Sequence, residues 1–249
     1  MNYRIRSKIS YLFHARHRKG HGIHSPFLFR LITNVIEDNG TYSAYPLLSA
    51  AEEHVRSMLK ILDQEYWQEP AVLKIERRIP LNRHQHLLPP RFNRLLFRLV
   101  NEFSPQQISF FGNTFGVSLL ALALADSRIP LVAVIPDYRY RSFCQRLVDE
   151  YNLTNIGVTE IGRVDSADFL VIQHPEDPVH CERILAKIVG QPDFCGVVVV
   201  CGIHASREME AVWNSYKQIQ SIRVSLDLFE TGILICKKGL QKEEFVVRF

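Results

Sequence analysis

"QQISFFGNTFGVSLLALALADSRIPLVAVIPD", from Gln106 to Asp137, is the stretch that decides the fold. An apolar strand leads into Gly112, a five-residue turn ends at Gly116, and a helix-favouring run precedes a second apolar strand. This order of strand, turn, helix and strand opens a nucleotide-type pocket in α/β proteins. The second strand of such a pocket usually ends in an acid, whereas this chain has Ile135 there. The stretch therefore predicts a fold more directly than it predicts a working pocket.

Strands and helices alternate in the rest of the chain. We predict strands at Ile108–Phe111, Leu131–Ile135, Asn155–Glu160, Asp168–Ile172 and Gly196–Val200, with helices near 117–126, 139–151, 177–189 and 205–220. Uniformly apolar strands such as "GVVVV" are typical of a parallel sheet that helices cover on both faces. The later segment "SIRVSLDLFETGILICKK" predicts an antiparallel hairpin. Five parallel strands followed by such a hairpin is the order of the Rossmann-like methyltransferase sheet.

The first hundred residues favour helices instead. One apolar stripe at helical spacing is formed by Ile5, Ile9, Leu12 and Phe13. In "KGHGIHSPFLFRLITNVIED", Ser25 is an N-cap and Pro26 occupies the first helical position. Further helices are predicted over 47–64 and over "PPRFNRLLFRLVNEF". We therefore divide the chain into an N-terminal helical extension or lid, 1–104, and a Rossmann-like methyltransferase domain, 105–249.

Composition and charge indicate a soluble, globular, cytoplasmic protein. Of the 249 residues, 47% are hydrophobic and 22% charged, which is typical of a chain that buries a core. Five irregularly spaced cysteines fit reduced thiols better than a disulfide framework. No signal-peptide apolar region is visible, and the apolar runs are too short to span a bilayer.

Basic residues are concentrated in two segments. Residues 1–36 hold seven Lys or Arg and no acid, and residues 71–100 hold seven against the single Glu76. Such segments form solvated helix faces, or they contact phosphates or an anionic membrane surface. The sequence shows no nucleic-acid motif, so a nucleic-acid partner is not expected.

Three long segments carry a resemblance to a known family. They are "HGIHSPFLFRLITNVI", "LPPRFNRLLFRLVNEFSP" and "IHASREMEAVWNSYKQIQSIRVSLDLFETGILICKKGLQKEEFVVRF". Together they resemble class I S-adenosylmethionine-dependent methyltransferases of Bacteroidetes-type bacteria. The resemblance implies the Rossmann-like class I fold and S-adenosylmethionine as cofactor. It also implies methyl transfer, as an O-methyltransferase, to a small-molecule acceptor.

The same resemblance implies which residues line the cofactor. They are Gly112, Asn113, Thr114, Gly116 and Ser118, in the turn and at the helix start. Glycine lets the backbone approach a ligand closely, and helix N-terminal N–H groups hold a carboxylate. The alternative is a tight strand-to-helix turn without a ligand. Asp137 is the candidate for the ribose hydroxyls, with a surface turn or a helix cap as its alternative.

Several positions depart from the family pattern. Phe110, Ile135 and Gln173 stand where acids are expected, and Cys201-Gly202 replaces two acids after the fifth strand. A Gly-rich element expected upstream is "LKIERRIPLN" here, at 73–82. These changes predict a divergent member with eroded cofactor and acid motifs. The alternative is a catalytically inactive methyltransferase-fold scaffold or binding protein.

His204 is the candidate catalytic residue, as a general base on an acceptor hydroxyl. Its alternative is to cap the helix that it precedes, or to hydrogen bond a neighbouring loop. A soft zinc site from Cys201, His204 and His174 is also conceivable, but no spacing matches a structural zinc module, and we predict no metal. His21, His24 and Ser25 line an acceptor pocket, or Gly22, Ser25 and Pro26 only set the angle between two helices while His24 packs against the sheet domain.

Overall fold

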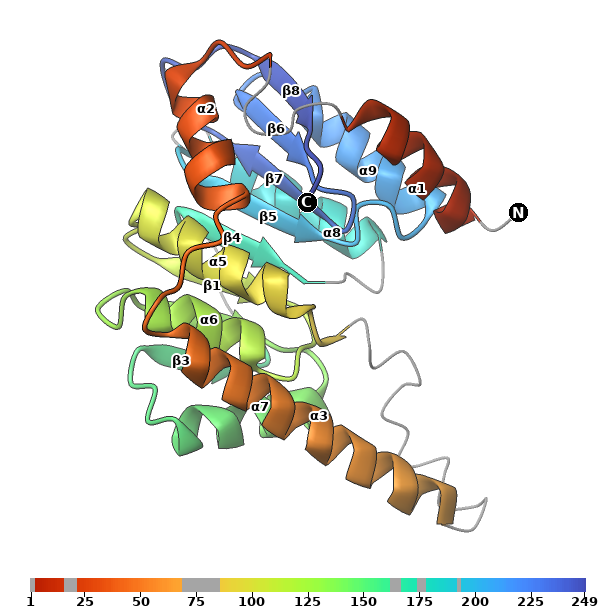
Figure 1. The fold of residues 1–249 in the computed structure, drawn as a ribbon, viewed down its shortest axis with the longest axis vertical. Helices are drawn as coiled ribbons and strands as arrows, with labels where there is room; N and C mark the ends of the chain where they lie inside the picture. Colours follow the sequence, from red (N-terminus) through yellow and green to blue (C-terminus); the bar gives the residue numbers. More distant parts are fainter. Residues whose placement is uncertain (1–2, 16–21, 69–85, 162–166, 174–177, 192–193) are drawn as a thin grey trace.

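A computed structural model describes residues 3–15, 22–68, 86–161, 167–173, 178–191 and 194–249. Eight strands of these residues form one sheet in the order β3-β2-β1-β4-β5-β7-β6-β8 (Figure 1). The strands are β1 (Ile108–Phe111), β2 (Leu131–Val134), β3 (Ile156–Thr159), β4 (Phe169–Ile172), β5 (Val197–Cys201), β6 (Val224–Asp227), β7 (Thr231–Ile235) and β8 (Glu243–Val246). The predicted strands and the hairpin are confirmed.

The sheet changes direction after its fifth strand. Strands β1 to β5 pair in parallel, whereas β7 runs antiparallel to both β5 and β6. The final strand β8 then pairs in parallel with β6 and extends the sheet by one more strand. We did not predict β8, because "EEFVVRF" offers only a short apolar run.

Helices flank the sheet. They are α1 (Tyr3–His14), α2 (Pro26–Leu31), the π-helix η1 (Ile32–Ile36), α3 (Tyr45–Gln68), α5 (Pro90–Phe103), α6 (Val117–Ala125), α7 (Tyr138–Glu150), α8 (Pro178–Val189) and α9 (Arg207–Lys217). Ser25 caps α2 as predicted, because its side chain accepts a hydrogen bond from the Leu28 N–H at 3.4 Å. The predicted upstream segment 73–82 lies outside the described residues.

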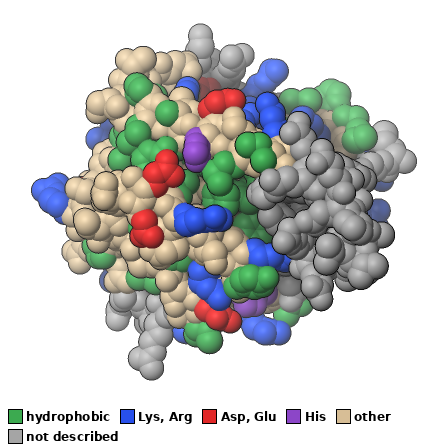
Figure 2. Space-filling model, turned by 90° about the horizontal axis from the view of Figure 1, so that it is seen from below, with side chains coloured by type: hydrophobic (Ala, Val, Ile, Leu, Met, Phe, Trp, Pro, Cys, Tyr) green, Lys and Arg blue, Asp and Glu red, His purple; other side chains and the backbone are tan. Residues whose placement is uncertain are grey.

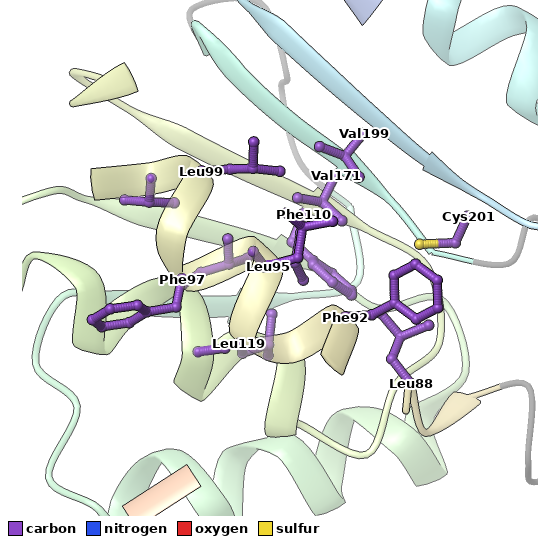
Figure 3. Packing of buried hydrophobic residues seen from close by; sticks show 14 of the residues in the cluster. Leu88, Phe92, Leu95, Phe97, Leu99, Phe110, Leu119, Val171, Val199 and Cys201 are labelled. Atoms are coloured by element: carbon purple, nitrogen blue, oxygen red, sulfur yellow. The ribbon is translucent and has the colours of Figure 1, made fainter. Parts of the chain in front are cut away.

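Two apolar clusters hold the layers together. The larger one joins α2, α3, α5, α6 and α7 to one face of the sheet, and the smaller one joins α8 and α9 to the other face. In Figure 3, Leu95 and Leu99 of α5 lie against Phe110, Val171 and Val199 of the sheet. Because the larger cluster includes residues from both sides of position 104, no break in packing matches the predicted division of the chain, which stays a prediction.

Helix α1 exposes its apolar side. The stripe predicted from the sequence is exposed at Ile5 (53%), Ile9 (43%), Leu12 (50%) and Phe13 (73%). The opposite, mostly polar side contacts the rest of the molecule, with Tyr11 buried. An amphipathic helix ordinarily does the reverse. None of the described helices is long and apolar enough to cross a bilayer.

Candidate functional site

The turn between β1 and α6 has a backbone that requires glycine. Gly112 has φ 121° and Gly116 has φ 84°, both in the left-handed region that disfavours other residues. A Cβ on Gly112 would lie 2.2 Å from the Gln173 carbonyl oxygen, so the turn packs directly on the end of β4. Inside the turn, the Gly116 N–H donates to Thr114 Oγ1 at 3.3 Å. The predicted turn is therefore present, and β4 helps to shape it.

The segment at His86 covers this turn. The His86 carbonyl oxygen accepts from the Phe115 N–H at 3.3 Å and from Gln173 Nε2 at 2.9 Å. The His86 ring also lies 3.0 Å, by Nδ1, from the Asn113 carbonyl oxygen. Thr114 is buried beneath these contacts. Sequence reasoning missed His86, because its partners are distant along the chain and no local pattern marks it.

Ser118 belongs to a buried chain of polar groups between helices. Its hydroxyl donates to Asn93 Oδ1 at 3.1 Å, and Asn93 Nδ2 donates to Glu52 Oε1 at 2.8 Å. Burial raises the pKa of Glu52, and the Asn93 hydrogen bond opposes the rise. Neither partner was predicted. Asn93 gives a signal in hindsight, because it is a polar residue on the apolar face of α5.

Asp137 lies beside the turn, as its predicted role requires. Its N–H donates to Asn113 Oδ1 at 3.1 Å, which joins the loop after β2 to the turn after β1. Its carboxylate caps α7 by accepting from the Arg139 N–H at 2.9 Å, and it also pairs with the Arg139 guanidinium at 2.5 Å. The Arg139 hydrogen bond lowers the pKa of Asp137, against the effect of burial. The side chain of Ile135, which stands where the family has an acid, is fully buried in the core.

His204 is placed elsewhere at the same edge of the sheet. It follows β5, whereas the turn follows β1, and β4 lies between those two strands. The helix cap at α9 is Ser206, which accepts from the Met209 N–H at 3.1 Å, so the capping alternative for His204 is wrong.

Both ring nitrogens of His204 have acidic partners. Nε2 lies 2.8 Å from Asp227 Oδ2, and Nδ1 lies 3.2 Å from Glu210 Oε2. Ser7 Oγ of α1 is also 3.2 Å from Nδ1, and the ring stacks on Phe229 at 5.3 Å. Burial acts to lower the pKa of His204, but the two carboxylates outweigh it and the pKa is raised. His204 thus joins α1, α9 and β6 at one point.

The described residues contain no cluster of three or more His, Cys, Asp or Glu side chains suited to a metal ion. Cys201 is buried, and the Thr231 hydroxyl donates to its sulfur at 3.9 Å. Burial raises the pKa of the Cys201 thiol to about 12, which disfavours the thiolate that a zinc ion would need. His174 and His21 lie outside the described residues. The Ser25 hydroxyl is used in the cap of α2.

Comparison with models of known protein families and with the sequences of characterised proteins gave no match. Solved structures do match. The SAH-bound methyltransferase PaMTH1 of Podospora anserina has a TM-score of 0.59 at 10% identity, over 87% of this chain and 97% of that one. An O-methyltransferase from Bacillus cereus in complex with SAH has a TM-score of 0.55 at 13% identity, over 75% and 90%. A methyltransferase from Geobacter sulfurreducens has a TM-score of 0.53 at 15% identity, over 81% and 94%. The chain therefore has the α/β fold of the class I methyltransferases.

Proposed function

We propose that this protein is an S-adenosylmethionine-dependent methyltransferase-like protein with altered cofactor motifs, acting on a small-molecule acceptor as an O-methyltransferase. The observation that carries the proposal is the turn from Gly112 to Gly116. It has the left-handed glycines and the following helix that a cofactor turn needs. It also follows the first strand of a sheet whose fold resembles that of two proteins solved with bound SAH.

The residues around the turn fit such a cofactor in part. The N-terminus of α6 provides N–H groups for a carboxylate. Asp137 lies beside the turn, because its N–H donates to Asn113 Oδ1, and in this proposal its carboxylate accepts hydrogen bonds from the ribose hydroxyls. When bound, S-adenosylmethionine supplies a methyl group on a positively charged sulfur, open to in-line attack by an acceptor oxygen.

His204 keeps its proposed role as the general base. Asp227 would orient the ring through Nε2, and Nδ1 would take the proton of an acceptor hydroxyl after exchanging its present partners, Glu210 and Ser7. Because its carboxylate neighbours raise its pKa, the neutral base form needs a higher pH than an ordinary histidine. In this proposal, activity rises with pH through the raised pKa.

A catalytically inactive scaffold is the second candidate. It is favoured by hydrogen bonds that the turn makes within the protein. The His86 carbonyl oxygen accepts from the Phe115 N–H of the turn and from the Gln173 side chain. The Arg139 guanidinium likewise occupies the Asp137 carboxylate.

Calorimetry with S-adenosylhomocysteine separates the two candidates. We expect micromolar binding to the wild type, weakened roughly 10- to 100-fold in Asp137→Ala, because hydrogen bonds to a charged group contribute about 1.5–3 kcal/mol. The matched control is Asp126→Ala. Asp126 accepts hydrogen bonds from the backbone N–H and the guanidinium group of Arg128, two residues later, just as Asp137 does from Arg139. It lies at the C-terminal end of α6, whereas the turn lies at the N-terminal end. Absence of heat with the wild type would favour the scaffold.

The basic N-terminal segment supports a second kind of contact, with an anionic surface. Arg6 and Lys8 flank the exposed apolar side of α1. A helix with that composition lies in the plane of a membrane interface. We assign this contact to the periphery of the molecule, apart from the turn.

A cytoplasmic location is supported by the thiols. All five cysteines are free in the structure. A reducing compartment keeps thiols in that state.

A further inference from the structure

A surface cavity of about 650 Å³ lies on the outer side of α5. Its walls come from η1 and the segment after it, from the start of α3, and from the last residues of the chain. In Figure 1 that last segment lies in front of the sheet, between α1 and α2. Four arginines line the cavity, namely Arg91, Arg94, Arg98 and Arg248. Three of them project from one side of α5, because they are spaced by three and four residues.

Among the described residues, none of these arginines forms a close ion pair with an acidic side chain, although Asp38 and Glu52 act electrostatically on Arg98 and Arg94. The acids that line the cavity are Glu37 and Asp38. Asp38 accepts instead from the Gly40 N–H and from the Tyr42 hydroxyl, each at 2.8 Å. Among the side chains that line the cavity, four guanidinium groups thus outnumber two carboxylates. Figure 2 shows one face of the molecule, on which Lys and Arg side chains lie among Asp and Glu side chains.

Arg98 is the structural member of the group. Only 6% exposed, it donates to the carbonyl oxygens of Val35 at 2.5 Å and Ile36 at 3.2 Å, and to the Tyr45 hydroxyl at 3.0 Å. Those carbonyls lie at the end of η1. Arg98 therefore fixes the wall of the cavity and holds a buried positive charge at its base.

The other guanidinium groups keep donors for a ligand. Arg94 lies over the Tyr45 ring at 5.1 Å and gives one hydrogen bond, to Ser49 Oγ at 3.2 Å. Its Nε is buried and has no partner among the described residues. A buried donor without a partner destabilises a protein by about 1–3 kcal/mol, and an anion in the cavity would remove that penalty.

Arg91 and Arg248 complete the opening of the cavity. Arg91 donates to the Phe249 carbonyl oxygen at 3.3 Å and lies 5.4 Å from the Phe249 ring. Arg248, the residue before, has no hydrogen bond to another described side chain or backbone group. Arg91 thus presents its guanidinium donors beside an aromatic ring, and Arg248 adds a second guanidinium group to the lining of the cavity.

We propose that this cavity binds an organic phosphate. Its volume is in the range of small-molecule sites and exceeds a lone phosphate ion. Guanidinium groups bind phosphate oxygens in a two-pronged manner, and the partly exposed Phe249 ring offers a flat surface for the organic part. The site is separate from the glycine turn, because none of the residues that line the cavity belongs to the turn or to the start of α6. The proposal of a phosphate site does not depend on the proposed methyltransferase activity.

Calorimetry with pyrophosphate, adenosine monophosphate, adenosine and citrate tests the site, on the full chain without S-adenosylmethionine. The two phosphates should bind and should weaken steeply with added salt, whereas adenosine should bind at least tenfold less well. Arg94→Gln and Arg248→Gln should each lower the affinity for phosphate tenfold or more. Arg248→Gln removes no hydrogen bond between described groups, so it should fold normally.

The matched control is Arg146→Gln. Arg146 lies over the Phe143 ring at 5.6 Å, as Arg94 lies over Tyr45, but on α7. Unchanged phosphate affinity in this variant is the expected result. The proposal is overturned if the wild type binds neither phosphate at millimolar concentration, if adenosine or citrate binds as tightly as adenosine monophosphate, or if Arg146→Gln loses as much affinity as Arg94→Gln.

Discussion

His204 is a single residue whose charge connects three elements. Its ring lies between Asp227 of β6 and Glu210 of α9, and Ser7 of α1 reaches the same nitrogen as Glu210. The Tyr3 hydroxyl of α1 also donates to Glu210. Burial acts to raise the pKa of Glu210, but Tyr3, His204 and Ser7 outweigh it and the pKa is lowered. The proton on His204 therefore stabilises the attachment of α1.

Stability should consequently depend on pH through this histidine. Because the folded pKa of His204 is raised, the stabilisation is complete below the unfolded pKa of about 6.5 and is lost as pH rises through the folded value. At pH 6, His204→Gln should lower the free energy of unfolding by about 1.5–3 kcal/mol, the contribution of hydrogen bonds to charged groups. Above the folded pKa the difference should shrink. Urea unfolding at a series of pH values measures both.

The control for this prediction is His54→Gln. His54 lies 3.9 Å from Glu150, and both side chains are about half exposed, so their pairing contributes little. An identical pH slope in the wild type and His204→Gln would contradict the assignment to His204.

At the scale of elements, the sequence predicted where strands and helices begin and end better than which side of a helix faces the core. The five parallel strands were predicted to within one residue at each end, because apolar runs bounded by Gly, Pro and Asp allow few other choices. The direction in which α1 faces could not be predicted. Its apolar stripe is visible in the sequence, but the polar partners that hold its other side lie more than 190 residues away in the chain.

The candidate site divides in the same way. The glycine turn follows from local sequence, since only glycine adopts its left-handed conformation easily. The contacts of His86 over the turn could not be predicted from local sequence, because Gln173 and His86 are separated by 87 residues and meet only in the folded protein. The arginine cavity was visible only as a basic segment.

Helix α1 should bind anionic vesicles through its exposed apolar side. Phe13→Asp should weaken co-sedimentation with phosphatidylglycerol vesicles by roughly 10- to 100-fold, because burying a large apolar side chain contributes about 1.5–3 kcal/mol. Ile61→Asp, at an apolar residue of α3 that is 55% exposed, should leave binding unchanged. Equal binding by wild type and Phe13→Asp would rule out α1 as the contact.

At the scale of the molecule, one continuous core joins the N-terminal helices to the sheet. Four of the five cysteines are buried in the two clusters or beside them, and only Cys195 is exposed. Burial raises the pKa of the Cys181 and Cys236 thiols to about 12. Their reactivity therefore reports how often the core opens.

Thiol titration should accordingly count one fast group in the native protein and five in denaturant. The four slow thiols should react at a common rate set by opening of the core, because neither the thiolate nor the reagent is accessible in the folded state. Cys195→Ser should abolish the fast phase. A second fast thiol in that variant would show that part of the core opens independently.

The bond from the Tyr11 hydroxyl to the Val247 carbonyl oxygen, 236 residues apart, has a consequence for protein synthesis. At about 5–20 residues per second, α1 leaves the ribosome roughly 10 to 50 seconds before its docking surface exists. During that interval both of its sides face solvent, and the apolar one is available to chaperones. Docking of the first helix must follow translation of the last strand, so a nascent chain stalled before β6 should still carry α1 undocked.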